Sequence, residues 1–146
     1  MIDISIFFES TRSINLIHPN IVKLSKNIFN DFNYSKAKLN IILTSDQYLL
    51  RMKKEYFKLE QFTDVISFTI NDNAPYIEGE IYISYDRVID NASTFCVSID
   101  NELRRVISHG LLHLVGLDDA SLIDKKKMTD YENKYIDSIS RIIDNG

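Results

Sequence analysis

Residues 106–121 read VISHGLLHLVGLDDAS, and this stretch holds two of the chain's three histidines. The apolar residues around them recur at helical spacing, which predicts a helix that ends near Val115. In a helix, positions 109 and 113 lie one turn apart on the same face, about 6 Å along the axis. The imidazoles of His109 and His113 can therefore share one metal ion.

The residues after the histidines complete a candidate ligand set. Gly116 stands where the helix ends, and its freedom to adopt positive φ lets the chain fold back. Asp118 and Asp119 then return toward the imidazoles, and either can add a carboxylate oxygen to the two nitrogens. Three protein ligands leave a fourth tetrahedral position open to water, as in catalytic zinc sites. The alternative is a pair of core histidines bonded to backbone carbonyls, but the spacing and the following glycine and aspartates favour a metal.

Position 110 separates this stretch from the metallopeptidase motif. That motif reads H-E-x-x-H, and its glutamate activates the water on the metal. Here the sequence is H-G-L-L-H, with Gly110 in place of the glutamate. Peptide hydrolysis is therefore the less favoured use of the metal.

Length and composition indicate one globular domain, and we expect it to span residues 1–146. The chain has 146 residues, of which 45% are hydrophobic and 26% charged, with only 4 Gly and 2 Pro,. No stretch approaches the roughly 20 apolar residues of a membrane span, and the first residues do not resemble a signal peptide. The single cysteine, Cys96, excludes an internal disulfide. We expect a cytoplasmic protein without membrane contact, in which Cys96 is a small buried residue.

Strands and helices are predicted in mixed order, with the strands in the first 85 residues. This order is typical of an α+β fold in which about four strands form a mixed sheet packed against helices. The metal site then lies at the end of the helix that carries the two histidines. Strands are predicted near 2–8, 39–44, 65–70 and 80–85, and helices near 18–33, 46–57, after 86, 99–115 and 122–143,.

The net charge of −4 argues against a protein that grips nucleic acid with its whole surface,. Any basic footprint must be local, and the alternative for each basic residue is a solvated helix face. The candidates are Arg51, Lys53, Lys54, Lys58, Arg104 and Arg105.

Four stretches stand out along the chain: TDVISF at 63–68, GEIYIS at 79–84, ELRRVISHG at 102–110 and HGLLHLVGLDD at 109–119. They resemble, in the right order, motifs of the YbeY family of bacterial metal-dependent endoribonucleases. HGLLHLVGLDD resembles the family signature H-G-x-L-H-L-x-G-x-D-H, and TDVISF resembles its T-[ND]-V-[LI]-S-F strand. GEIYIS matches its G-[DE]-I-x-I-[SC] strand, and ELRRVISHG matches the approach to the ligand helix. The resemblance covers most of the chain from about residue 39 to residue 119.

The resemblance implies the ligands and the substrate. The ligands would be His109, His113 and Asp119, the last in place of the family's usual histidine. One zinc ion per chain is expected, and the carboxylate makes another divalent ion acceptable. The implied activity is cleavage of single-stranded RNA in maturation of the 3′ end of small-subunit ribosomal RNA and in ribosome quality control. Asp118 would then position the attacking water or accept a hydrogen bond from the second nitrogen of a ligating imidazole.

A second departure concerns phosphate binding. The family commonly has an arginine six residues before the T of its T-[ND]-V motif, where this chain has Phe57. Lys58 is the expected catalytic substitute, although an ammonium lacks the two-pronged grip of a guanidinium. The basic candidates above would contact phosphate, and bases would stack on Tyr56, Phe57 or Tyr76 unless these rings belong to the core. Thr63, Asp64 and Ser67 would line the cleft or serve the packing of the sheet.

Two other functions stay open at this point. One is a different metal-dependent hydrolase, acting on an ester or a peptide. The other is a ribosome-associated module with a structural or vestigial metal. Because the chain is acidic, binding to free RNA should be weak and salt-sensitive, so docking on the ribosome or a ribosome-associated protein would supply specificity.

Overall fold

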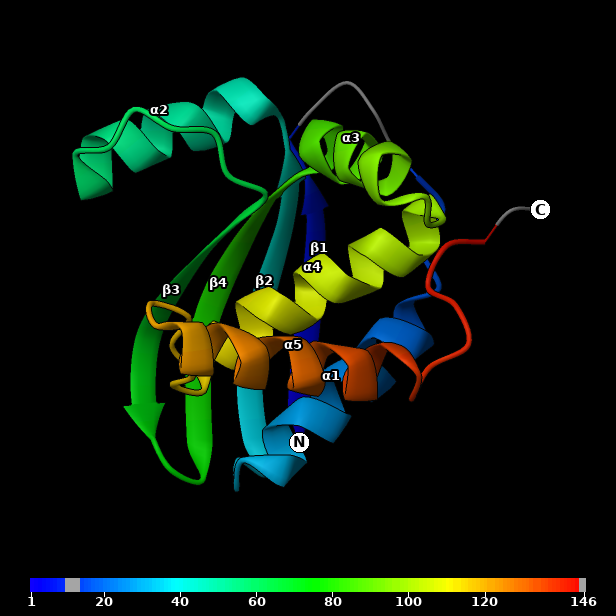
Figure 1. Ribbon diagram of the computed structural model, residues 1–146. Coiled ribbons are helices and arrows are strands. Elements are labelled where there is room, and N and C mark those ends of the chain that lie inside the picture. Colours follow the sequence, from blue (N-terminus) through cyan, green and yellow to red (C-terminus); the bar gives the residue numbers. More distant parts are fainter. Residues whose placement is uncertain (10–13, 145–146) are drawn as a thin grey trace.

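Four strands in the described part of the chain form one mixed sheet in the order β1-β2-β4-β3. The computed structural model describes residues 1–9 and 14–144 (Figure 1). β1 (Ile2–Phe8) and β2 (Lys36–Thr44) run parallel, as do β2 and β4 (Tyr76–Ser84). β3 (Val65–Asn73) forms an antiparallel hairpin with β4 and is one edge of this sheet, with β1 at the other. Residues 10–13 and 145–146 of the predicted domain lie outside the described residues.

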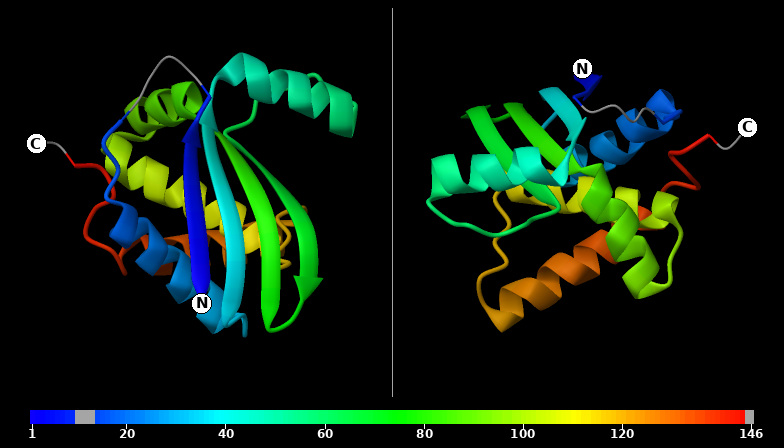
Figure 2. Two further views of the ribbon diagram at one scale, coloured as in Figure 1. Left: turned by 180° about the vertical axis from the view of Figure 1, so that it is seen from behind. Right: turned by 90° about the horizontal axis from the view of Figure 1, so that it is seen from above.

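Helices cover the two faces of the sheet unequally. Seen from behind, the strands lie in front of α1, α4 and α5, and α2 alone lies at one end of the opposite face (Figure 2). The small cluster of Leu49, Met52 and Ile66 joins α2 to that face. The five helices of the described residues are α1 (His18–Asp31), α2 (Asp46–Phe57), α3 (Tyr85–Phe95), α4 (Ile99–Leu114) and α5 (Leu122–Ile136).

The core lies between the sheet and α4. Alternate residues of the strands point to this face and are buried, as the period of two requires. α4 packs on this face with a stripe of apolar residues at helical spacing, so the helix lies flat on the strands. The buried strand residues include Leu39, Ile41, Leu43, Ile81 and Ile83, and those of α4 include Leu103, Val106, Ile107, Leu111 and Leu114.

Serine N-caps define where four of the helices begin. Ser45, Ser84, Ser98 and Ser121 each accept a hydrogen bond from the backbone N–H three residues later. This bond satisfies one of the free donors of the first turn and stabilises a helix by about 1 kcal/mol. The cap at Ser98 fixes the start of α4, the helix that carries the two histidines.

The predicted α+β fold with a four-stranded mixed sheet is confirmed, and so is a helix that ends next to Val115. Two details of the sequence prediction are wrong. Cys96 is exposed and ends α3 in the left-handed conformation, with φ of 56°. The last helix stops at Ile136 and not near Ile143. None of the helices in residues 1–9 and 14–144 is long and apolar enough to span a membrane.

The early end of α5 has a tertiary cause. Beyond Ile136 the backbone is held by side chains of α4, which replace the bonds of a continuing helix. Asp100 accepts the N–H groups of Ile142 and Ile143, at 2.9 and 2.7 Å. Ile142 is fully buried, so the apolar pattern that extends past residue 136 belongs to an irregular segment packed on α4.

Candidate metal centre

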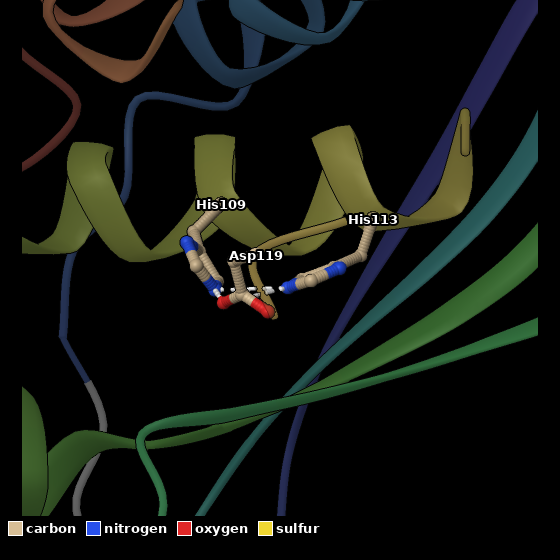
Figure 3. Close-up of side chains that lie close together, drawn as sticks. All are labelled: His109, His113 and Asp119. Atoms are coloured by element: carbon tan, nitrogen blue, oxygen red, sulfur yellow. Dashed lines mark hydrogen bonds and ion pairs between the residues drawn. The ribbon is translucent and has the colours of Figure 1, made fainter. Parts of the chain in front are cut away.

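Three side chains converge where α4 ends and the following loop begins. The Nε2 atoms of His109 and His113 lie 3.0 Å apart, and Oδ2 of Asp119 lies 3.4 Å from each of them. Both rings project from one face of α4, and the carboxylate of Asp119 faces them from the loop (Figure 3). The helix thus supplies two donor atoms and the loop a third.

The spacing of these donors fits a tetrahedral ion. With metal–ligand bonds of about 2.0 to 2.1 Å, the edge of a zinc tetrahedron measures about 3.3 Å. The three separations of 3.0, 3.4 and 3.4 Å are close to that edge. Among the described residues, these three side chains form a group whose donor atoms all lie within 4.8 Å of one another. The cluster can therefore hold a metal ion with three protein ligands.

The loop after α4 orients His113. Gly116 has φ of 103°, a conformation that side chains disfavour, and turns the chain back over the helix end,. The carbonyl of Leu117 then accepts the Nδ1–H of His113 at 3.0 Å. This bond places the proton of the neutral ring on Nδ1 and leaves Nε2 free to bind a cation.

His109 is oriented by Glu132, a residue that the sequence prediction missed. Oε2 of Glu132 accepts the Nδ1–H of His109 at 2.6 Å, and Oε1 lies 3.0 Å from Nη1 of Arg105. Glu132 is buried on α5, 23 positions after the histidine. A signal existed in the sequence: an acidic residue interrupts the apolar stripe that Met128 and Tyr135 form at helical spacing,.

Asp118 and Asp119 have different positions, although both follow the glycine turn. Asp119 reaches the imidazoles, whereas the side chain of Asp118 is exposed. Oδ1 of Asp118 accepts the backbone N–H of Asp119 at 2.7 Å. Asp118 therefore shapes the loop that presents Asp119 and does not contact either histidine ring through a hydrogen bond.

Nearby carboxylates set the electrostatics of the cluster. Burial alone would lower the pKa of His109, but its bond to Glu132 and the charges of Glu132, Asp64 and Asp119 raise that pKa above its usual value. Burial raises the pKa of Asp64, and the charge of His109 opposes this shift. Negative potential at the cluster thus favours a cation beside His109, whether a proton or a metal.

The cluster opens into a pocket of about 550 Å³ between α4, the start of β3 and the end of α2. The wall opposite the histidines includes Thr63, Asp64 and Ser67, as the sequence suggested. The lining residues are Lys53, Phe57, Gln61, Thr63, Asp64, Val65, Ile66, Ser67, Thr69, His109, His113 and Asp119.

The pocket receives a different lysine from the one predicted. Lys53 lines it, with Nζ 5.1 Å from the centre of the Phe57 ring. Lys58 is exposed, ends α2 with φ of 57° and is not among the lining residues. Lys54 pairs with Glu60 at 2.8 Å, and Arg51 lies over the ring of Tyr48. Of the three cations of α2, Lys53 is thus the one that lines the pocket with the candidate ligands.

The two arginines of α4 are occupied elsewhere. Nη1 of Arg104 donates to the carbonyls of Ile136 and Ile139, at 2.8 and 2.6 Å, and its Nε pairs with Asp100 at 2.7 Å. Arg105 is bound to Glu132 and, through Nη2, to Asn133 at 3.0 Å. Neither arginine lines the pocket, because both hold the C-terminal part of the chain on α4.

The three aromatic candidates for base stacking, Tyr56, Phe57 and Tyr76, also differ in whether they reach the pocket. Tyr56 and Phe57 are 61% and 44% exposed, and both rings contact Phe68 on the open face of the sheet. Tyr76 lies at the start of β4, where its hydroxyl donates to Glu78 at 3.0 Å. Of the three rings, only Phe57 lines the pocket.

Comparison with known proteins places these features in a family. The model of the family described as Endoribonuclease YbeY matches residues 6–140. Proteins named Endoribonuclease YbeY include one from Amoebophilus asiaticus, 35% identical over 131 residues that cover 89% of each chain. Another, from Cytophaga hutchinsonii, is 43% identical over 95 residues, covering 65% of this chain and 66% of the relative. A solution structure of a Thermotoga maritima protein superimposes with a TM-score of 0.60 at 25% identity, covering 94% of this chain and 87% of the other.

Proposed function

Because this chain belongs to the endoribonuclease YbeY family, we propose that it is a metal-dependent endoribonuclease that cuts single-stranded RNA in the pocket beside His109. The observation that carries the proposal is the triangle of two imidazole nitrogens and one carboxylate oxygen at the pocket wall. Three converging ligands beside an accessible pocket are typical of a catalytic metal site, whereas a structural site is closed by four protein ligands.

His109, His113 and Asp119 would hold the ion, and the donor set suits zinc. Two neutral imidazoles and one carboxylate are common zinc ligands, and the carboxylate also tolerates harder ions such as manganese. When bound, the ion supplies Lewis-acid polarisation of a phosphoryl oxygen and activation of water. Asp118 would keep the loop in the conformation that presents Asp119.

The protein's own contribution to substrate binding would come from α2 and β3. Lys53 would neutralise a phosphate at the pocket, in place of the predicted Lys58, because only Lys53 lines it. The ring of Phe57 is exposed beside Lys53 and would stack with an unpaired base,. A ring and a cation side by side select a single strand, because bases in a duplex are not free to stack on protein.

Arg104 and Arg105 would not contact RNA, because both are bound to other parts of the chain. Lys54 and Arg51 lie outside the pocket and would contribute less than Lys53. This leaves few cations for phosphate, in a chain of net charge −4. Binding to free RNA would therefore be weak and would fall steeply with salt. We propose that the substrate is small-subunit ribosomal RNA near its 3′ end, in the cytoplasm. Docking on the ribosome or an associated protein would supply the missing affinity and serve maturation and quality control.

Position 110 argues against a peptidase that uses the same metal. Gly110 is buried against the sheet, and a Cβ there would lie 3.0 Å from Val65 and 3.3 Å from Ile81. A glutamate at this position has no room against these side chains. The general base of the metallopeptidase motif is thus excluded by packing as well as by sequence.

The test compares substrates under one set of conditions. Protein stripped of metal with a chelator is mixed with an unstructured RNA, the DNA of the same sequence, the RNA in a duplex, a peptide and an ester. The proposal predicts that only the single-stranded RNA is cut, and only after zinc or manganese is restored. Cleavage of the ester or peptide instead would show a different hydrolase. Tight zinc binding without any cleavage, free or on ribosomal particles, would show a module with a structural metal.

A further inference from the structure

We propose that Glu132 is a positioning residue: its carboxylate keeps the proton of His109 on Nδ1, so that Nε2 presents a lone pair to the ion. The inference rests on the proposed function, since it concerns the same centre. Glu132 contacts His109 on the side of the ring away from the ligand cluster, with Oε2 2.6 Å from Nδ1. It therefore acts through the imidazole.

Among the residues that the structure describes, each oxygen of Glu132 has one hydrogen-bond partner. The residue is only 7% exposed, and a buried carboxylate is costly unless donors surround it,. Oε2 accepts from His109, and Oε1 accepts from Nη1 of Arg105 at 3.0 Å. The two groups that donate to Glu132, one from His109 and one from Arg105, require a side chain with two acceptors. A carboxylate supplies both,.

Arg105 is itself held in place by other partners, so its Nη1 always presents a donor to position 132. Its Nη2 donates to Oδ1 of Asn133 at 3.0 Å, and its Nε lies 3.9 Å from Oε1 of Glu102. A guanidinium has five donors, no acceptor and no accessible neutral form. The Nδ1 of a neutral histidine can be either a donor or an acceptor, because the ring proton can sit on either nitrogen. The guanidinium of Arg105 can only donate.

This asymmetry predicts what an amide would do at position 132. Glutamine has one oxygen and one NH2 group, and the charged Arg105 would take the oxygen. The NH2 group would then face Nδ1 of His109, which must become an acceptor and move its proton to Nε2. The lone pair directed at His113 and Asp119 would be lost, although the shape of the side chain is unchanged. A purely structural role for Glu132 predicts no change of tautomer.

The experiment uses Glu132→Gln, with Asp130→Asn as the matched control on the exposed side of the same helix. The tautomer of His109 is read from imidazole ¹⁵N shifts in metal-free protein, at a pH above the pKa of the ring. Zinc affinity is measured by competition with a chelator. We expect wild type and D130N to carry the proton on Nδ1. E132Q should carry it on Nε2 and bind zinc more than about tenfold more weakly.

A second substitution tests the same logic by rescue. Arg105→Met removes the competing donor, so in R105M/E132Q the glutamine oxygen can turn to His109. The Nδ1–H tautomer should return, with zinc affinity within about threefold of R105M alone. R105M/E132L has no acceptor at position 132 and should not recover. If E132Q does not fold, this pair decides the question, and equal tautomers and equal zinc affinities in the two double variants would overturn the inference.

The results separate this inference from the proposed function, because neither readout involves RNA. If wild type binds zinc with the expected tautomer and cuts no RNA, the proposed function fails and the role of Glu132 stands. If E132Q keeps both the Nδ1–H tautomer and the zinc affinity of wild type, Glu132 does not position His109, whatever the protein does to RNA.

Discussion

Gly110 of α4 lies so close to Val65 of β3 that a Cβ at position 110 would be 3.0 Å from Cγ2 of Val65. Its next neighbours, Cγ2 of Ile81 and Oγ of Ser67, would be 3.3 Å away. Ser67 also donates a hydrogen bond to the carbonyl of Gly110 at 2.8 Å. The missing side chain thus lets the ligand helix approach the wall of the pocket between its two histidines.

Gly110→Ala should therefore destabilise the fold, although alanine is the better helix former. Overpacking a core costs about 1 to 3 kcal/mol, and the gain in helix propensity returns about 1 kcal/mol. We expect a net loss of about 1 kcal/mol in the free energy of unfolding, measured with denaturant. In a Val65→Ala background the shortest of these contacts is gone, and the same substitution should cost less. An equal cost in both backgrounds would mean that Val65 does not limit the approach.

The two aspartates of the loop should differ in their effect on the metal. Asp119→Ala removes a ligand and should weaken zinc binding by more than tenfold. Mutation of residues that only support a ligand already weakens metal binding about tenfold or more. Asp118→Ala removes only a bond to an exposed backbone N–H and should change zinc affinity by less than about threefold,. Chelator competition on both variants makes the comparison. Exchanged phenotypes would transfer the ligand role to Asp118.

Lys53→Gln should weaken RNA binding and lower the salt dependence of the affinity by about one ion, because one phosphate contact is lost. Lys58→Gln is the control on the exposed end of α2, and it should leave both quantities unchanged. Fluorescence titration of an unstructured RNA at several salt concentrations measures the slope. A loss confined to K58Q would restore the role that the sequence suggested for Lys58.

Tyr135→Phe tests a contact outside the pocket and has a defined pH dependence. The hydroxyl of buried Tyr135 donates to Asp31 at 2.7 Å, and this bond is the main cause that lowers the pKa of Asp31. A lowered pKa stabilises the fold above the unfolded pKa of about 4, and the contribution is lost as pH falls through the folded pKa.

The loss in Y135F should be about 1 kcal/mol at neutral pH, since Asp31 is 46% exposed and partly screened by water,. The difference between wild type and Y135F should shrink below about pH 4. Denaturant unfolding across this range measures it. A difference that grows on acidification would show that Asp31 is not the group linked to Tyr135.

Local sequence was enough to predict the helix that carries the ligands. Ser98 caps it, the apolar stripe sets its face, and positions 109 and 113 follow from the helical period. Gly116 then predicts the return of the loop, although the sequence alone did not decide between Asp118 and Asp119. That choice depends on a backbone bond within the loop, which no periodicity reveals.

The features that the sequence did not reveal depend on tertiary partners. Arg104 looks like a free cation in the sequence, but the carbonyls that occupy it belong to residues 136 and 139, more than thirty positions away. The same distant segment ends α5 early, although its apolar residues continue the pattern of a helix. Glu132 was missed for the converse reason, since a single acidic residue on a helix is usually solvated and only the packed fold shows it behind His109.

A titration of RNA cleavage with zinc decides whether the cluster of His109, His113 and Asp119 is the catalytic metal site. Metal-free wild-type protein is supplied with increasing zinc, and the rate on an unstructured RNA is recorded together with the bound metal. We predict no cleavage without metal, a rate that rises in step with occupancy and saturates at one ion per chain, and neither binding nor cleavage in a folded His113→Ala variant. Cleavage that persists in the metal-free protein, or an H113A variant that binds zinc and cuts RNA like wild type, would contradict the account.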